Sequence, residues 1–181
     1  MKRLLILLSV ITVVFAGVAS ASVQQGDTEL DFLGGFMTQN STDGGPDVDS
    51  WFLSGAVGYF LTDNIQVAGA AMGAWTEVTV PGASIDIDIY GIGGKAKYHF
   101  MPTNQWVPYV GGQALWATVD LDAAGDADGM LWGPLAGLRY ELNAYNDFYV
   151  EYQYQMWEGD IADIGLDDGH ALLVGIVHQF K

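Results

Sequence analysis

The sequence predicts an all-β protein, an eight-stranded antiparallel up-and-down transmembrane β-barrel. Three observations predict it. Apolar and polar residues alternate along segments long enough to cross a bilayer. Short turns alternate with longer loops between these segments. Aromatic residues gather near both ends of the segments. Half of the 181 residues are hydrophobic, yet no stretch after Ala21 is long and apolar enough for a transmembrane helix.

The first 21 residues have the pattern of a secretory signal peptide. They combine a basic head, an apolar run over residues 4–18 and an Ala-Ser-Ala cleavage site that ends at Ala21. A membrane-spanning helix is the alternative, and the shortness of the run and the small residues at its end disfavour it. We therefore expect residues 1–21 to be removed and residues 22–181 to form one barrel domain.

The first expected strand covers residues 27–38. Leu30 and Phe32 occupy one face, and Glu29 and Asp31 occupy the other. A loop rich in Gly, Asp and Pro follows it. The strand therefore has one apolar and one acidic face.

The clearest hairpin spans residues 51–75, with a Thr-Asp-Asn turn at its centre. Trp51 and Trp75 each lie twelve residues from Asp63. Twelve residues in a strand tilted by about 40° climb about 30 Å, which matches the hydrocarbon core of a bilayer. We predict that this hairpin crosses a membrane and that its tryptophans mark the far interface.

The fourth expected strand covers residues 88–100, where an apolar face opposes Lys95, Lys97 and His99. The preceding run of isoleucines at 85, 87 and 89 is out of phase with that face, which predicts a bulge or a change of environment. The remaining expected strands cover residues 106–117, 130–142, 148–156 and 170–180, with longer loops at 78–86, 120–129 and 158–169.

Two aromatic bands are expected, because Trp and Tyr favour membrane interfaces. One lies at the loop ends of the strands: Trp51, Trp75, Trp116, Trp132 and Trp157. The other lies near the short turns or the terminus: Phe60, Phe100, Trp106, Tyr140, Phe148 and Phe180. Trp157 has the inward parity of its strand and is the exception. A soluble lipocalin-like binding barrel is the alternative fold; the double banding disfavours it.

These segments resemble the small outer-membrane barrels of the OmpA/OmpX type. The resemblance is carried by residues 57–64 (VGYFLTDN), 107–111 (VPYVG) and 170–180 (HALLVGIVHQF). Gly175 and Phe180 match the family's terminal insertion signal, whereas His178 and Lys181 depart from it. The resemblance implies an eight-stranded barrel in a Gram-negative outer membrane, reached through the periplasm. Because the given sequence ends at the eighth expected strand, we expect no peptidoglycan-binding domain of the kind that some relatives carry.

The charge balance excludes several function classes. The chain has 22 acidic residues against 6 Lys and Arg, so no basic patch is available for nucleic acid. It has no cysteine, which excludes disulfides and thiolate metal sites. We expect no cofactor, a monomer, and outer-membrane lipid and lipopolysaccharide as partners.

The expected interior network consists of the ionic residues opposite the apolar faces: Lys95, Lys97, Arg139, Glu141 and Glu151, together with Glu29 and Asp31. Buried charges must be paired, so these residues form either a structural plug or a gated, porin-like path for ions or small solutes.

Acidic residues fill the expected loops, and the set Asp120, Asp122, Asp126 and Asp128 is the weak candidate for divalent-cation binding. A solvated surface explains most of this charge better than cation binding does. The Asp126-Ala-Asp128-Gly129 fragment lacks the other ligands of a full calcium loop.

Catalysis is not expected. A lipid-modifying enzyme needs a nucleophile with a base in reach, and no histidine is followed two residues later by a serine. Ser54 and His170 could meet only across the barrel, and His99 is expected at the rim near a short turn. The sequence therefore predicts a structural or surface-interaction role, with a narrow channel as the alternative.

Overall fold

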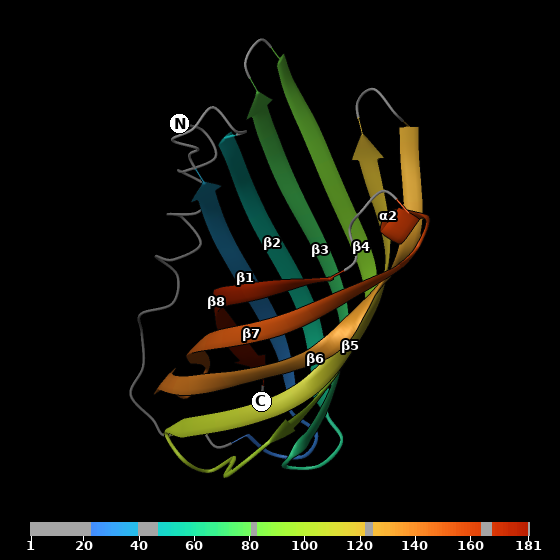
Figure 1. The fold of residues 1–181 in the computed structure, drawn as a ribbon. Helices are drawn as coiled ribbons and strands as arrows, with labels where there is room; N and C mark the ends of the chain where they lie inside the picture. Colours follow the sequence, from blue (N-terminus) through green and yellow to red (C-terminus); the bar gives the residue numbers. More distant parts are fainter. Residues whose placement is uncertain (1–22, 40–46, 81–82, 122–124, 164–167, 181) are drawn as a thin grey trace.

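The computed structural model describes residues 23–39, 47–80, 83–121, 125–163 and 168–180 (Figure 1). Its elements are β1 (Thr28–Gln39), β2 (Asp47–Phe60), β3 (Ile65–Val80), β4 (Ala83–His99), β5 (Trp106–Leu121), β6 (Gly125–Asn143), β7 (Asn146–Gly159), α2 (Asp160–Asp163) and β8 (Asp168–Phe180). Each strand pairs antiparallel with the next, and β8 returns to β1. The predicted eight-stranded up-and-down barrel is confirmed.

The expected signal peptide at residues 1–21 lies outside the described residues. Within the described ranges, no helix is both long and apolar enough to cross a membrane.

Side chains alternate between the two faces of the barrel wall along most of each strand. In β6 the buried and exposed positions alternate along almost the whole strand. Ile92 on β4 is 70% exposed, whereas Lys95 on the same strand is 5% exposed. Apolar residues therefore cover the outer surface and ionic residues lie inside, which is the reverse of a soluble barrel.

The strands at the loop end are longer than the sequence predicted. Residues 78–86 and 120–129, expected as loops, belong mostly to β3, β4, β5 and β6. The apolar alternation stops where these hairpins leave the apolar belt, but their antiparallel ladders continue without a register shift. The bulge considered in β4 is therefore absent. The phase of the isoleucines at 87 and 89 instead reflects a change of environment, because the interior is apolar at the loop end of the barrel.

Exposed aromatic rings lie near both ends of the barrel. At the short-turn end, Trp106 packs on Tyr140 with ring centroids 4.5 Å apart, and at the loop end, Phe36 packs on Trp51 at 4.4 Å. One predicted member was wrong, because Phe60 has inward parity and is fully buried inside. Trp157, the exception by parity, belongs to β7 rather than to a loop and packs on interior apolar clusters.

The interior changes character along the barrel axis. Polar and charged residues fill the end near the short turns, where β2 joins β3, β4 joins β5 and β6 joins β7. Apolar clusters fill the loop end; one contains Ala56, Ala70, Leu115 and Leu131, and another contains Ala117, Val119, Ala127 and Ile161 of α2. The candidate functional site is therefore the polar half of this interior.

Candidate functional site

One group of ion pairs joins strands on opposite sides of the barrel. The Nζ atom of Lys97 on β4 lies 3.0 Å from Oδ2 of Asp31 on β1 and 3.7 Å from Oε2 of Glu151 on β7. The Nζ atom of Lys95 lies 3.5 Å from Oε1 of Glu151. All four side chains are almost fully buried. They meet because odd-numbered positions point inward on β1, β4 and β7.

Arg139 on β6 is the centre of a second group. Its Nη1 atom donates to Oε2 of Glu29 at 2.8 Å, and its Nε atom donates to Asp147. Gln66 donates to the other oxygen of Glu29, and Gln179 donates to Asp147 at 2.8 Å. The guanidinium therefore bridges β1 and β7, and neutral amides give its two carboxylates a further donor each.

Neutral side chains also satisfy Glu151. The hydroxyl of Tyr109 donates to Oε2 at 2.9 Å, and Nε2 of Gln153 donates to Oε1 at 2.7 Å. The Nζ atom of Lys97 lies 5.2 Å from the ring centroid of Tyr109 and 5.5 Å from that of Tyr149. Glu151 is thus held by two cations and two hydrogen-bond donors.

The structure brings most of the sequence-predicted interior residues together. Lys95, Lys97, Arg139 and Glu151 are buried and ion-paired, as are Glu29 and Asp31. Glu141 is also buried, at 8% exposed, near the turn that joins β6 and β7. This plug therefore contains side chains from β1, β4, β6 and β7, and the surrounding strands add amides.

Sequence reasoning missed Asp147 and Gln66. Asp147 lies just before the expected strand at 148–156, although the inward parity of Glu151 continues to it along β7. His99 was expected at the rim but is 1% exposed, between Phe60 and Tyr109 at ring-centroid distances of 5.2 and 5.3 Å. His99 has the same odd-numbered, inward-facing parity as Lys95 and Lys97, and this parity could have predicted its burial.

The acidic candidates lie at the loop end. Three of them belong to strands rather than to a loop: Asp120 to β5, and Asp126 and Asp128 to β6. Asp122 lies outside the described residues. Asp120 is the register partner of both Asp88 and Asp126, so three carboxylates stand side by side on the outer face. In the described ranges, no three His, Cys, Asp or Glu residues are grouped so that they could hold a metal ion.

The serine and histidine considered for catalysis do not face each other. Ser54 on β2 is 3% exposed and has inward parity, whereas His170 on β8 is exposed on the outer face. The Nδ1 atom of His170 instead lies 2.6 Å from the hydroxyl of Tyr152. The barrel wall therefore separates the two groups.

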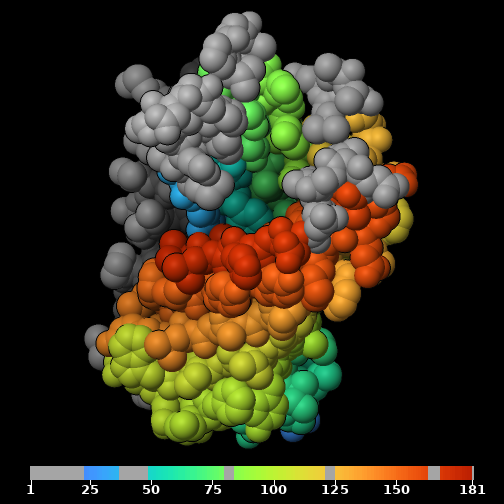
Figure 2. All heavy atoms as spheres, viewed as in Figure 1, coloured from blue at the N-terminus to red at the C-terminus, as the bar shows by residue number. Residues whose placement is uncertain are grey.

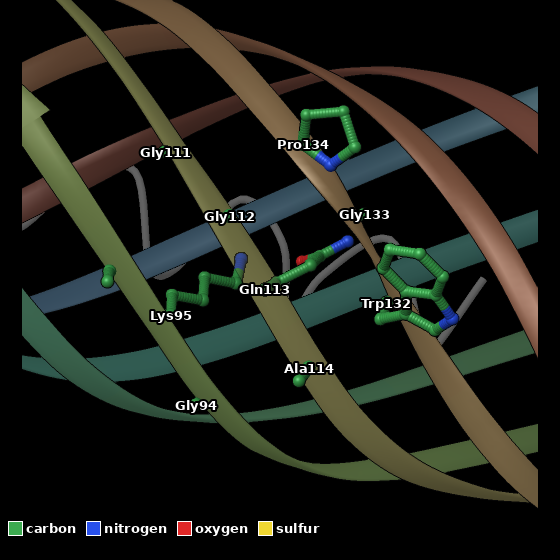
Figure 3. A pocket seen from close by; sticks show the side chains of 10 residues that line it. Gly94, Lys95, Gly111, Gly112, Gln113, Ala114, Trp132, Gly133 and Pro134 are labelled. Atoms are coloured by element: carbon green, nitrogen blue, oxygen red, sulfur yellow. The ribbon is translucent and has the colours of Figure 1, made fainter.

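A shallow concave patch lies on the outer face of β4, β5 and β6 (Figure 3). Its bed is formed by small residues such as Gly94, Gly112 and Ala114, and Trp132 and Pro134 border it on β6. This patch belongs to the apolar outer surface of the barrel.

Comparison with known proteins identifies the family. The family model that describes the outer membrane protein β-barrel domain matches residues 9–180 of this chain. The chain belongs to this family. It is therefore an outer-membrane barrel of the Gram-negative type, in which the short turns face the periplasm and the longer loops face outward.

Solved structures of outer-membrane barrels share the fold. Neisserial surface protein A is 18% identical, with a TM-score of 0.61 over 86% of this chain and 98% of that one. OprG of Pseudomonas aeruginosa is 16% identical, with a TM-score of 0.55 over 88% and 98%. The N-terminal barrel of OprF from the same organism is 18% identical, with a TM-score of 0.53 over 87% and 99%. No curated protein matches the chain.

Proposed function

We propose that this outer-membrane barrel has a structural or surface-interaction role and that its interior plug closes it to ions and solutes. The observation that carries the proposal is the pairing of every cation in the plug with a buried carboxylate. Lys95, Lys97 and Arg139 each lie within 4 Å of one or more carboxylate oxygens. No catalytic role is proposed.

The energetics of buried ions support closure. Removing one partner of a buried pair costs about 3–5 kcal/mol, because the other charge is left without compensation. An ion that crossed the barrel would have to separate several of these pairs and the amides that hold them. Spontaneous passage is therefore expected to be rare.

A narrow channel is the alternative function, and one observation favours it. Several buried polar atoms of the plug have no hydrogen-bond partner among the described residues, including Oδ1 of Asp31, Nη2 of Arg139 and Oδ1 of Asp147. Such atoms are usually satisfied by water, and connected waters would form a polar path.

Conductance in planar bilayers decides between the two. The refolded protein is expected to leave the membrane silent in molar KCl. The Glu151→Gln variant, which releases Lys95 and Lys97 from a carboxylate, is expected to give occasional openings. Regular single-channel steps from the unaltered protein would establish the channel instead.

The proposed partners are outer-membrane lipid and lipopolysaccharide, in contact with a monomer. The exposed apolar faces support the first, and the row of Asp88, Asp120 and Asp126 at the outer rim supports bridging to anionic headgroups through divalent cations. Calorimetric titration of the refolded protein with calcium tests the bridging. Because the described carboxylates do not form a metal site by themselves, heat at low millimolar calcium is expected only when lipopolysaccharide is also present, and its absence there would remove the cations from the proposal.

A further inference from the structure

The seam between β1 and β8 is the shortest in the described barrel. Its pairing begins at Thr28 of β1 and ends at Gly34↔Val174. By contrast, β1 pairs with β2 as far as Gln39, and β7 pairs with β8 as far as Asp168. Beyond Gly34 and Val174, one edge of each strand therefore has no partner strand among the described residues.

The two strands separate where their pairing ends. In Figure 1, β1 rises steeply while β8 crosses it obliquely, so the strands diverge toward the loop end. In Figure 2, the described atoms leave a hollow directly above β8. The free edge of β8 therefore faces a hollow and not another described strand.

One hydrogen bond shows which backbone groups of β8 are unpaired. The amide of Gln179 donates to the carbonyl of Tyr145, just before β7, at 2.7 Å. Odd-numbered residues of β8 therefore direct their N–H and C=O groups toward β7, and because the antiparallel register has no shift, even-numbered residues direct theirs the other way. The unpaired groups of the free edge belong to Asp168, His170 and Leu172.

The free edge lies at the outer interface of the membrane. On the outer face beside it, Nδ1 of His170 lies 2.6 Å from the hydroxyl of Tyr152, and the hydroxyl of Tyr154 donates to Oδ2 of Asp168 at 2.6 Å. Tyrosine favours the height at which its ring meets lipid and its hydroxyl meets water. Unpaired backbone groups are excluded from the hydrocarbon region but can be solvated here, so a partner from the aqueous side can reach them.

An extended polypeptide is the partner that matches such an edge. The unpaired N–H and C=O groups recur at every second residue, about 7 Å apart, and another strand presents donors and acceptors at the same spacing. Residues 168–173 have the length of an ordinary strand. Their other edge is already fixed by β7, from Met156↔Asp168 to Glu151↔Leu173. The edge is therefore held in place before a partner arrives.

The charge around the edge favours a basic partner. Every Lys and Arg in the described ranges is buried in the plug, as Lys95, Lys97 and Arg139. Asp168 is exposed on the edge itself, and Glu158 is exposed on the adjoining strand β7. A segment with Lys or Arg side chains is attracted to this surface, whereas an acidic segment is repelled.

We propose that residues 168–173 of β8 are a docking edge for an extended, basic segment of another polypeptide, which adds a strand to the barrel wall at the outer interface. This proposal deepens the surface-interaction role proposed above and rests on it. Main-chain hydrogen bonds hold the segment, and alternate side chains select it. Its outward positions lie beside Asp168, which favours Lys or Arg, and its inward positions lie beside the small residues Gly169 and Ala171.

Amide exchange, measured by NMR, tests the edge itself. The refolded protein in phosphatidylcholine nanodiscs is mixed with a terminally blocked peptide of alternating Lys and Val. Without the peptide, the amides of Ala171 and Leu173 are expected to be protected by β7, and those of His170 and Leu172 to exchange freely. Saturating peptide is expected to slow exchange at His170 and Leu172 by about 10-fold or more and to change Ala171 little.

Two substitutions at one position separate backbone pairing from attraction to the surface. Leu172→Pro removes an N–H group that faces away from β7, so the ladder with β7 keeps its bonds. It is expected to weaken binding of the labelled peptide, measured by fluorescence anisotropy, by about 10-fold. Leu172→Ala keeps the N–H group and is expected to change binding by less than about 2-fold.

The charge is tested separately. Asp168→Asn is expected to weaken binding of the Lys-Val peptide by about 3-fold, and this loss should shrink at high salt. Equal binding of a matched peptide of alternating Glu and Val would contradict the basic character of the partner. Heat-modifiable gel migration reports the folding of each variant.

The other outcomes are also distinct. No saturable binding, or binding without protection of His170 and Leu172, would overturn the proposal, and the second result would mean adsorption on the acidic surface only. Protection of these amides before the peptide is added, or by added lipopolysaccharide instead of the peptide, would assign the edge to another occupant and would also overturn it. If Leu172→Pro does not fold, amide exchange of the unaltered protein decides alone. None of these measurements depends on conductance, so their failure leaves the test of the closed plug unchanged.

Discussion

Tyr109 on β5 lies over Gly137, its register partner on β6, so closely that a Cβ atom at position 137 would overlap the ring. Tyr149 and Gly175 repeat the arrangement between β7 and β8. In both pairs the missing side chain creates the space for an aromatic ring inside a narrow barrel. The hydroxyl of Tyr109 then reaches Glu151 at 2.9 Å, so the glycine also positions the plug.

Gly137→Ala is therefore expected to destabilise the barrel by about 1–3 kcal/mol, because the ring of Tyr109 must leave its place. Urea unfolding of the refolded protein in vesicles measures this loss. Gly69→Ala on β3 is the control, since a Cβ there would meet nothing within 4 Å. An equal loss in the two variants would show that the ring contact is unimportant.

Glu151→Gln is expected to cost about 3–5 kcal/mol of unfolding free energy, because Lys95 and Lys97 keep their charge but lose a common carboxylate. Glu158→Gln at an exposed position of the same strand is expected to stay within about 0.5 kcal/mol of the unaltered protein. Lys95→Met is expected to cost less in the Glu151→Gln background than alone. Additive losses would mean that the two side chains do not interact.

Asp120→Asn is expected to stabilise the barrel by about 0.2–1 kcal/mol, because Asp120 stands directly opposite both Asp88 and Asp126 and like charges in that position repel. The gain should shrink as salt rises, since the screening length falls from about 8 Å at physiological ionic strength to about 3 Å in molar salt. Urea midpoints at the two salt concentrations measure it. A gain that is independent of salt would point to a cause other than charge.

The alternation of side chains made most of the barrel predictable. Leu138 and Arg139 already showed which face carries lipid and which carries ions, and the positions of Lys97 and Glu151 followed from the same parity. Membrane insertion imposes this pattern along a crossing strand. The pattern can therefore be recognised in the sequence of one strand without knowing which strands pair with it.

Other features depend on neighbours that a single strand does not reveal. The end of the pairing between Gly34 and Val174 is set by how two strands distant in sequence diverge. The continuation of β5 to Leu121 and the start of β6 at Gly125 depend on a ladder above the apolar belt, where the apolar signal is lost. The pairing of Arg139 on β6 with Glu29 on β1 required the closed ring of strands.

Ile161 on α2 anchors the segment between β7 and β8 to the interior. It is fully buried against Ala117, Val119 and Ala127. Ile161→Ala removes much of this contact and is expected to destabilise the docked segment by about 2 kcal/mol or more, the low end for such a truncation. The ladders of the barrel do not depend on Ile161, so the urea midpoint should move little.

Limited proteolysis of intact vesicles from the outer side should instead show cleavage between β7 and β8 about 30-fold faster, because cleavage follows the population of the opened segment. Ile161→Val keeps most of the contact and should change the rate by less than about 10-fold. Equal cleavage rates in all three proteins would mean that this side chain does not hold the segment in place.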